Sequence, residues 1–234
     1  VRKPWILANV EGRTPTQISA AQWSPNGQQV LLATNVGIQE VRSPEWKVVR
    51  VFSAGSGVSD AQFVSHTGDA KPQEQDSNIL TFDGNTARLW NNQSRKQIAS
   101  FRGPFPIRDV ALTSGESTLA VSAGLTLRIF DGTMTEGQGG KPLFRLPEEQ
   151  GVEVTCLAPD EQTSSRLAFA DSTGVIRLGQ WDQATNTLTI RWSFKAVESP
   201  VVALRWTPQH DHLAVVSVLG EVVLLNTDGV ATAR

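Results

Sequence analysis

Cysteine and histidine are scarce in the sequence, and long hydrophobic runs are absent from it. The single cysteine, Cys156, excludes an internal disulfide bond and any thiolate metal cluster within the chain. No apolar run approaches the ~18 residues that a membrane-spanning helix needs, and the N-terminus carries no signal-peptide pattern. These absences permit a reducing compartment, and they leave the localisation open, with the cytoplasm favoured.

The sequence also lacks an excess of charge of either sign. It has 21 Lys and Arg residues against 23 Asp and Glu residues, for a formal net charge of −2. This balance gives no electrostatic reason to expect nucleic acid or an anionic membrane as a partner. We therefore expect neither nucleic-acid binding nor membrane insertion. No stretch shows a helical period of useful length, so the apolar residues are expected in strands.

A short pattern, apolar-x-x-apolar-x-(aromatic or Leu), recurs five times along the chain. The last position of the pattern is occupied by Trp23, Phe63, Leu112, Leu157 and Trp206, and successive occurrences are 40, 49, 45 and 49 residues apart. A period of about 40–50 residues is typical of four-stranded propeller blades. Each occurrence is followed by a β-rich run, a turn that contains glycine and a third strand, as in residues 79–90. Small sheets are marginal alone in water, and stacking them around an axis buries their faces.

The sequence therefore predicts an all-β chain, with about five four-stranded antiparallel blades in a single β-propeller domain over residues 1–234. The repeats are expected at residues 11–52, 53–101, 102–146, 147–194 and 195–226, with an N-terminal strand at residues 3–10. Aromatic residues at the recurring position are predicted to form the core between blades: Trp23, Phe63 and Trp206. Other tryptophans fall in outer strands, where packing is favoured over exposure on the rim: Trp5, Trp46 and Trp192.

Several short motifs resemble those of WD-repeat (WD40-like) propellers, and the resemblance covers nearly the whole chain. Residues 23–27 (WSPNG) look like the family's strand-and-turn entry, and residues 88–91 (RLWN) resemble its terminal dipeptide. Residues 128–131 (RIFD) and 181–182 (WD) are imperfect matches. The resemblance implies a module for protein–protein interaction, a scaffold that can form part of a larger protein or assembly.

The repeats also depart from that family. Its members usually have Gly-His before the first strand of each blade, whereas residues 12–13, 55–56, 103–104 and 151–152 lack the histidine. In that family the histidine belongs to a buried hydrogen-bond network with Asp, Ser or Thr, and Trp, and Asp83 with Trp90 is expected to form the best partial version of this network. In this family the N-terminal strand commonly completes the last blade. We therefore expect residues 4–10 to pair with residues 221–226.

Catalytic and metal-binding chemistry is not indicated by any motif. His210-Asp-His212 invites a metal site, but no third ligand is visible nearby, and a solvated turn is favoured. Residues 137–140 (GQGG) lack the Lys-Ser/Thr of a phosphate-binding loop. Cys156 follows the strand pattern and is expected to be an inert packing residue. We expect no catalytic residue, no metal and no cofactor.

Carboxylates at the entrance of the innermost strands keep one alternative open. Asp60 and Asp109 occupy equivalent repeat positions, and Glu153 lies close to the same place. Some five-bladed propellers are glycoside hydrolases, and two-carboxylate chemistry needs the acids ~5–10 Å apart around one pocket. A glycan-binding or glycan-cleaving propeller is therefore the alternative function, and a purely structural subunit is a third. The competing interpretation of these acids is hydrogen bonding to backbone at strand entry.

A proline-flanked aromatic residue is the strongest candidate for partner binding. Residues 102–108 (RGPFPIR) place Phe105 between two prolines and two arginines, and aromatic residues and arginine are enriched at interface hot spots. We expect a protein or peptide partner to bind the loops that enter the innermost strands. The expected contact residues are Arg13, Ser56, Arg102, Phe105, Arg108, Glu148 and Glu198. The sequence leaves the partner, the binding face and the oligomeric state open.

Overall fold

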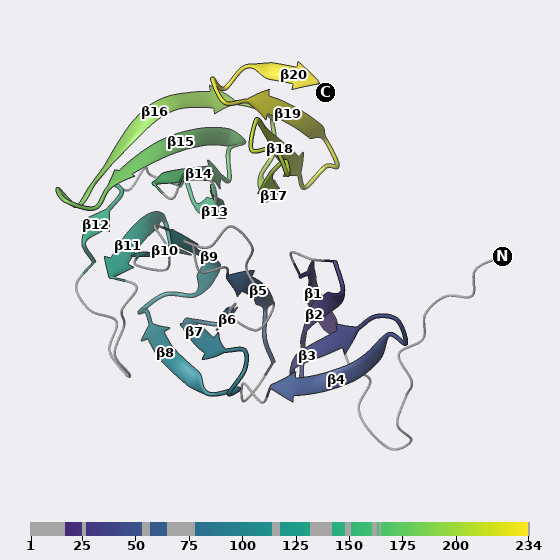
Figure 1. The fold of residues 1–234 in the computed structure, drawn as a ribbon. Helices are drawn as coiled ribbons and strands as arrows, with labels where there is room; N and C mark the ends of the chain where they lie inside the picture. The colour runs from purple at the N-terminus through teal and green to yellow at the C-terminus, as the bar shows by residue number, and fades with distance from the viewer. Residues whose placement is uncertain are drawn as a thin grey trace. The chain divides into compact units, whose positions relative to one another are not determined.

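A computed structural model describes residues 17–24, 27–52, 57–64, 78–113, 118–131, 142–147, 151–160, 163 and 165–233. Within these ranges the chain contains strands and no helix, arranged as five four-stranded antiparallel sheets (Figure 1). The predicted fold class, a five-bladed β-propeller, is confirmed. The chain divides into two compact units, residues 1–61 and 62–234, which are described separately.

The first unit contains one complete sheet. Its strands follow one another in chain order: β1 (Ile18–Trp23), β2 (Gln29–Thr34), β3 (Gly37–Arg42) and β4 (Lys47–Phe52). Thr34 closes the β2–β3 turn by donating its hydroxyl proton to the Gly37 carbonyl, 2.7 Å away. The Trp23 side chain is 58% exposed and meets Trp46 edge-on, with ring centroids 5.5 Å apart. The prediction that Trp23 belongs to the core is therefore wrong.

The other four sheets repeat the same meander. The second sheet contains β5 (Asp60–Val64), β6 (Asn78–Asp83), β7 (Thr86–Asn91) and β8 (Gln97–Arg102). The third contains β9 (Ile107–Thr113), β10 (Thr118–Ala123), β11 (Thr126–Asp131) and β12 (Phe144–Arg145). The fourth contains β13 (Val154–Pro159), β14 (Arg166–Asp171), β15 (Val175–Asp182) and β16 (Thr187–Lys195), and the fifth β17 (Val201–Trp206), β18 (His212–Ser217), β19 (Val222–Asn226) and β20 (Ala231–Ala233).

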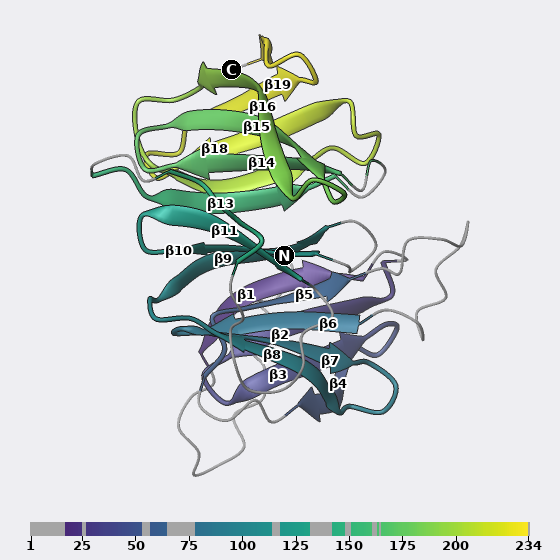
Figure 2. The same cartoon turned by 90° about the vertical axis from the view of Figure 1, so that its left-hand side faces the viewer.

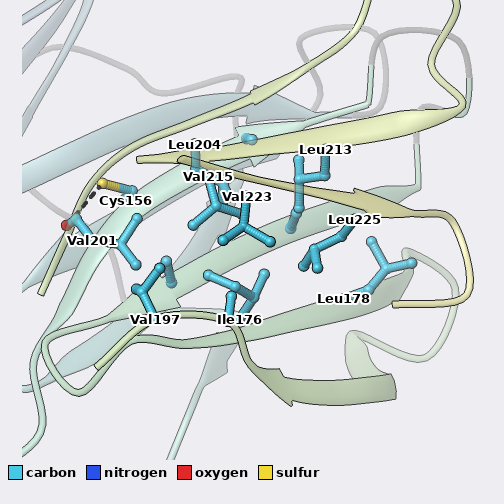
Figure 3. Packing of buried hydrophobic residues seen from close by; sticks show 14 residues of the cluster. Cys156, Ile176, Leu178, Val197, Val201, Leu204, Leu213, Val215, Val223 and Leu225 are labelled. Carbon is cyan, nitrogen blue, oxygen red and sulfur yellow. Dashed lines mark hydrogen bonds between the residues drawn. The ribbon is translucent and has the colours of Figure 1, made fainter. Parts of the chain in front are cut away.

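Buried side chains from neighbouring sheets form the core of the second unit. The sheets β9–β12 and β13–β16 lie side by side in Figure 2, with Phe169 and Trp181 buried in the cluster between them. Between the fourth and fifth sheets, Ile176 of β15 packs in one cluster with Val215 and Leu225 (Figure 3). Burial of each such side chain contributes about 1.5–3 kcal/mol. Alternating side chains thus hold consecutive sheets face to face.

Three side chains donate hydrogen bonds to backbone carbonyls at or just before the first residue of an inner strand. Ser19 donates to the carbonyl of Val58 at 2.5 Å, and the Ser122 hydroxyl donates to the carbonyl of Val154. From a different strand position, the Cys156 thiol of β13 donates to the carbonyl of Val201 at 3.5 Å (Figure 3). The accepting residues all lie at or just before the first residue of the following inner strand.

The pairing of β13 with β14 corrects the predicted alignment of the fourth repeat. Trp23, Leu112 and Trp206 each pair with the second residue of the next strand, and the residue that does so in the fourth sheet is Pro159. Leu157, which the sequence pattern selects, lies two residues earlier. Side chains alternate with a period of two along a strand, so a two-residue shift keeps every apolar residue on its face.

The last sheet differs from the expectation at its outer edge. Its fourth strand is β20, which pairs with β19 through Leu224 opposite Ala233 and Leu225 opposite Ala231. Residues that follow the turn at 226–229 therefore occupy the place expected for the N-terminal strand. Residues 3–10 lie outside the described part of the chain, as does Trp5.

The other aromatic residues pack largely as predicted. Phe63 is buried, and Trp206 donates its indole N–H to the Ala158 carbonyl of the neighbouring sheet at 3.1 Å. Trp192 donates to the carbonyl of Thr227 at 2.9 Å. Its ring lies so close to Gly229 that a Cβ there would come within 2.7 Å of it. The outer strand of the fourth sheet is thereby joined to the last turn of the fifth.

Candidate interaction face

The predicted contact residues that the structure describes all lie in or beside loops that enter the innermost strands. Arg102, Phe105 and Arg108 lie at the β8–β9 connection, and Glu198 lies in the β16–β17 connection. The structure thus groups the first three and places Glu198 two connections further along the chain. Arg13, Ser56 and Glu148 lie outside the described residues.

The β8–β9 connection is held at both ends by the β6–β7 turn. The Gly103 N–H donates to the Asn85 carbonyl, and the Asn85 side-chain amide donates to the Gly103 carbonyl, both at 2.9 Å. The Ile107 N–H donates to the Gly84 carbonyl at 2.7 Å. The two prolines at 104 and 106 restrict φ within this short bridge. The backbone that presents Phe105 is therefore rigid.

The Phe105 ring is packed on one side and open on the other. The side chain is 47% exposed, and a Cβ on Gly124 would lie 3.4 Å from its Cγ atom. The Arg128 guanidinium carbon lies 5.6 Å from the ring centroid, within the range of a cation–π contact. Phe105 therefore packs against the next sheet with part of its ring and leaves the rest exposed, while its role in binding a partner stays a prediction.

Arg108 occupies a β-bulge at the start of the inner strand. The register of β9 against β10 passes from Asp109 to Ile107 and leaves Arg108 unpaired in the ladder. Its guanidinium lies 3.1 Å from a carboxylate oxygen of Glu153, and both side chains are partly exposed. Such an exposed ion pair contributes about 1 kcal/mol at most. Arg108 is consequently presented to solvent and only weakly held.

The same bulge recurs in other sheets. Register shifts leave Ser19 of β1, Thr155 of β13 and Val202 of β17 in the place that Arg108 takes in β9. The inner strands β9, β13 and β17 are neighbours. The bulges of these three strands therefore place Arg108, Thr155 and Val202 along one edge of the second unit.

At the fifth sheet, the side chains along this edge are apolar and exposed. They come from the bulge of β17, from the β18–β19 turn and from the first residue of β19: Val202, Val218, Leu219 and Val222. Sequence reasoning missed them, although the turn at residues 218–219 has two apolar residues, where the equivalent turns at 35–36 and 124–125 have one and those at 84–85 and 172–173 have none. That contrast between equivalent turns is the signal that could have found them.

Of the three carboxylates considered for glycan chemistry, Asp60 and Asp109 accept backbone N–H groups, whereas Glu153 pairs with Arg108. Asp109 accepts the N–H of Val110 with one oxygen and that of Leu157 with the other, both at 2.8 Å. Asp60 accepts the N–H of Ala61 at 2.8 Å. The residue equivalent to Asp60 and Asp109 in the fourth sheet is Cys156, not Glu153, because the repeat is shifted by two residues. These contacts match the interpretation of hydrogen bonding at strand entry.

Other polar groups sit in structural contacts. Trp90 donates its indole N–H to Thr81 at 2.9 Å, while Asp83 pairs with Arg88 at 2.6 Å, so the predicted Asp83–Trp90 network is split in two. His210 lies 2.7 Å from the buried carboxylate of Asp160. Among the described residues, no three His, Cys, Asp or Glu side chains gather as a metal ion would require. None of the described segments is a helix long and apolar enough to cross a membrane.

Two titratable groups have shifted pKa values. Burial, followed by the negative charge of Asp109, raises the pKa of the Cys156 thiol to about 11. This thiol therefore stays protonated and donates to Val201. Burial disfavours the charged form of Asp171, but hydrogen bonds from Thr173, Arg177 and Val175 outweigh it and lower the pKa of that carboxyl.

A scan against protein-family models found no family that matches this chain, and a search of the curated proteins found no relative.

Proposed function

We propose that this chain is a protein-interaction scaffold, a propeller module similar to WD-repeat propellers, which binds a protein or peptide partner through the loops that enter its inner strands. In this proposal it performs no chemistry of its own. Its binding residues among the described ones are Arg102, Phe105 and Arg108, with Glu198 as a more distant contributor.

One observation carries the proposal: a half-exposed aromatic side chain stands on a rigid loop between arginines. Three hydrogen bonds hold that loop at its two ends, so little conformational entropy is lost when Phe105 is covered by a partner. Aromatic and arginine side chains dominate the binding energy of many interfaces. The glycan alternative draws no support from Asp109, because both of its oxygens already accept backbone N–H groups.

The test is a quantitative affinity purification from the source cells, with the wild type compared with a Phe105→Ala/Arg108→Ala double variant. Ile98→Ala, on the outer strand β8, removes an equally exposed apolar side chain and serves as the matched control. We expect a specific protein to be retained by the wild type and by the control, and to be lost with the double variant. If all three retain the same proteins, or none retains any, the proposal is wrong. Equal melting temperatures establish that the variants are folded.

A further inference from the structure

The bulge residues of three neighbouring inner strands occupy equivalent positions, and the chemistry of their side chains changes from one strand to the next. We call these three residues, Arg108, Thr155 and Val202, the bulge stripe. Phe105 and Arg102 flank the end at the third sheet, and the β18–β19 turn flanks the end at the fifth. Between the two ends stands the small, half-buried side chain of Thr155.

The end at the third sheet is suited to a carboxylate. Arg108 has five N–H donors in its guanidinium group, and its recorded ion pair, with Glu153, is partly exposed and easily exchanged. A carboxylate accepts two parallel N–H bonds from such a group, which gives directionality as well as charge complementarity. Arg102 is exposed on the same connection. The open side of the Phe105 ring provides an apolar contact next to these charges.

The end at the fifth sheet is suited to apolar side chains. Val202 is 56% exposed and Leu219 is 77% exposed, with Val218 and Val222 exposed beside them. The turn that carries Leu219 is ordered by two backbone hydrogen bonds of 3.0 Å, from Gly220 to Ser217 and from Ser217 to Glu221.

The acidic residue nearest in sequence to this apolar end is already bound. One carboxylate oxygen of Glu221 accepts hydrogen bonds from the hydroxyls of Ser217 at 3.0 Å and Ser199 at 3.2 Å. Its negative charge is therefore directed at these two hydroxyls. Val218, Leu219 and Val222 lie within five residues at one turn, and exposed apolar side chains grouped in this way are candidates for contact with a partner.

We propose that the bulge stripe binds one extended peptide segment of a partner protein, with an acidic residue against Arg108 and Arg102 and apolar residues against Val202 and Leu219. This inference rests on the proposed function, and it specifies the class of partner: an acidic–apolar segment that crosses the inner strands β9, β13 and β17. Opposite charge at one end and apolar burial at the other fix the direction in which the segment lies.

Selection from a library of displayed random peptides tests the inference on the full chain without knowledge of the natural partner. Peptides of about twelve residues reach at most ~40 Å when extended. We expect the enriched peptides to carry Asp or Glu separated from a pair of apolar residues. Enrichment of basic peptides, or of peptides without an acidic residue, would overturn the inference but leave the proposed function standing. No enrichment at all would overturn both.

Variants then test each end with one synthetic peptide by fluorescence anisotropy. We expect an Arg102→Glu/Arg108→Glu variant to weaken binding by about tenfold or more, and Leu219→Ser to weaken it as well. Replacing the acidic residue of the peptide by Lys should restore binding to the charge-reversed variant, a gain that misfolding cannot produce. Arg191→Glu and Ile98→Ser, on the outer strands β16 and β8, are the controls and should leave binding unchanged. Binding that is insensitive to the Arg and Leu219 variants would place the peptide elsewhere and overturn the inference.

Discussion

Two glycines at corresponding turns offer a sharp test of how the sheets pack. Gly174 in the β14–β15 turn and Gly220 in the β18–β19 turn have nearly equal positive φ angles, +87° and +83°. A Cβ on Gly220 would meet nothing within 4 Å, whereas a Cβ on Gly174 would run into the backbone carbonyl of Val197. The Gly174 carbonyl also accepts the N–H groups of Ala196, at 3.0 Å, and Val197. The same substitution therefore carries the same backbone strain at both sites and a steric clash at only one.

The expected costs differ accordingly. Gly220→Ala forces an alanine into left-handed backbone, which costs about 1–2 kcal/mol. Gly174→Ala carries that cost and also displaces the β16–β17 connection, and a forced shift of this kind adds about 1–3 kcal/mol. We expect Gly174→Ala to lower the free energy of unfolding by ~2–5 kcal/mol in all.

Urea unfolding of both variants measures the difference. With a slope of about 2–3 kcal/mol per molar urea, an added loss of ~1–3 kcal/mol lowers the midpoint by roughly 0.3–1.5 M relative to Gly220→Ala. Equal midpoints for the two variants would refute the close approach of Val197 to the turn. An unchanged slope is needed for the comparison, because a changed slope signals an altered unfolded or native state.

Three further predictions concern buried polar groups. Asp171 has a lowered pKa in the folded chain, so the stability that it contributes is complete above its ordinary pKa of 3.8 and is lost as the pH falls through the lowered value. The variant Asp171→Asn should therefore show a smaller loss of stability in that pH range of an acid-unfolding curve. An unchanged curve would contradict this prediction. The Cys156 thiol, with a pKa of about 11, should react with a thiol reagent at pH 8 far more slowly in the folded chain than in urea, and equal rates would show that it is accessible. Asp109→Ala leaves the Leu157 N–H without its carboxylate acceptor and should cost about 1–3 kcal/mol in urea unfolding; a loss no greater than that of Arg191→Ala would show that this bond is dispensable.

The blade pattern was predictable from sequence because it depends on local alternation and on glycine turns. The same locality limits the prediction. A strand shifted by two residues keeps its faces, so Leu157 was chosen in place of Pro159. The sequence did not indicate β20 either, because a strand of only three residues is too short to show an alternation of apolar and polar side chains.

The candidate site was predicted where local chemistry determines it. Two prolines around Phe105 indicated a stiff loop, and the structure has one. Val202 was missed because a β-bulge has no signature in the apolar pattern, and its exposure depends on that bulge. The role of Asp109 depends on a partner 48 residues away, Leu157. Contacts of that range require the packing of whole sheets and are not encoded near either residue.

The hydrogen bonds that enter the inner strands have a consequence for how such repeats diverge. In each case a hydroxyl or thiol donates to a main-chain carbonyl at or just before the first residue of the inner strand that follows in the chain: Ser19 to Val58, Ser122 to Val154 and Cys156 to Val201. Because every residue type has a carbonyl, the accepting repeat is free to change its side chain there. The bond requires a particular side chain only on the donor, and Ser19, Ser122 and Cys156 supply it from three different strand positions. Neighbouring repeats can therefore diverge in sequence without coordinated changes. The five repeats accordingly share little beyond the spacing of their apolar residues.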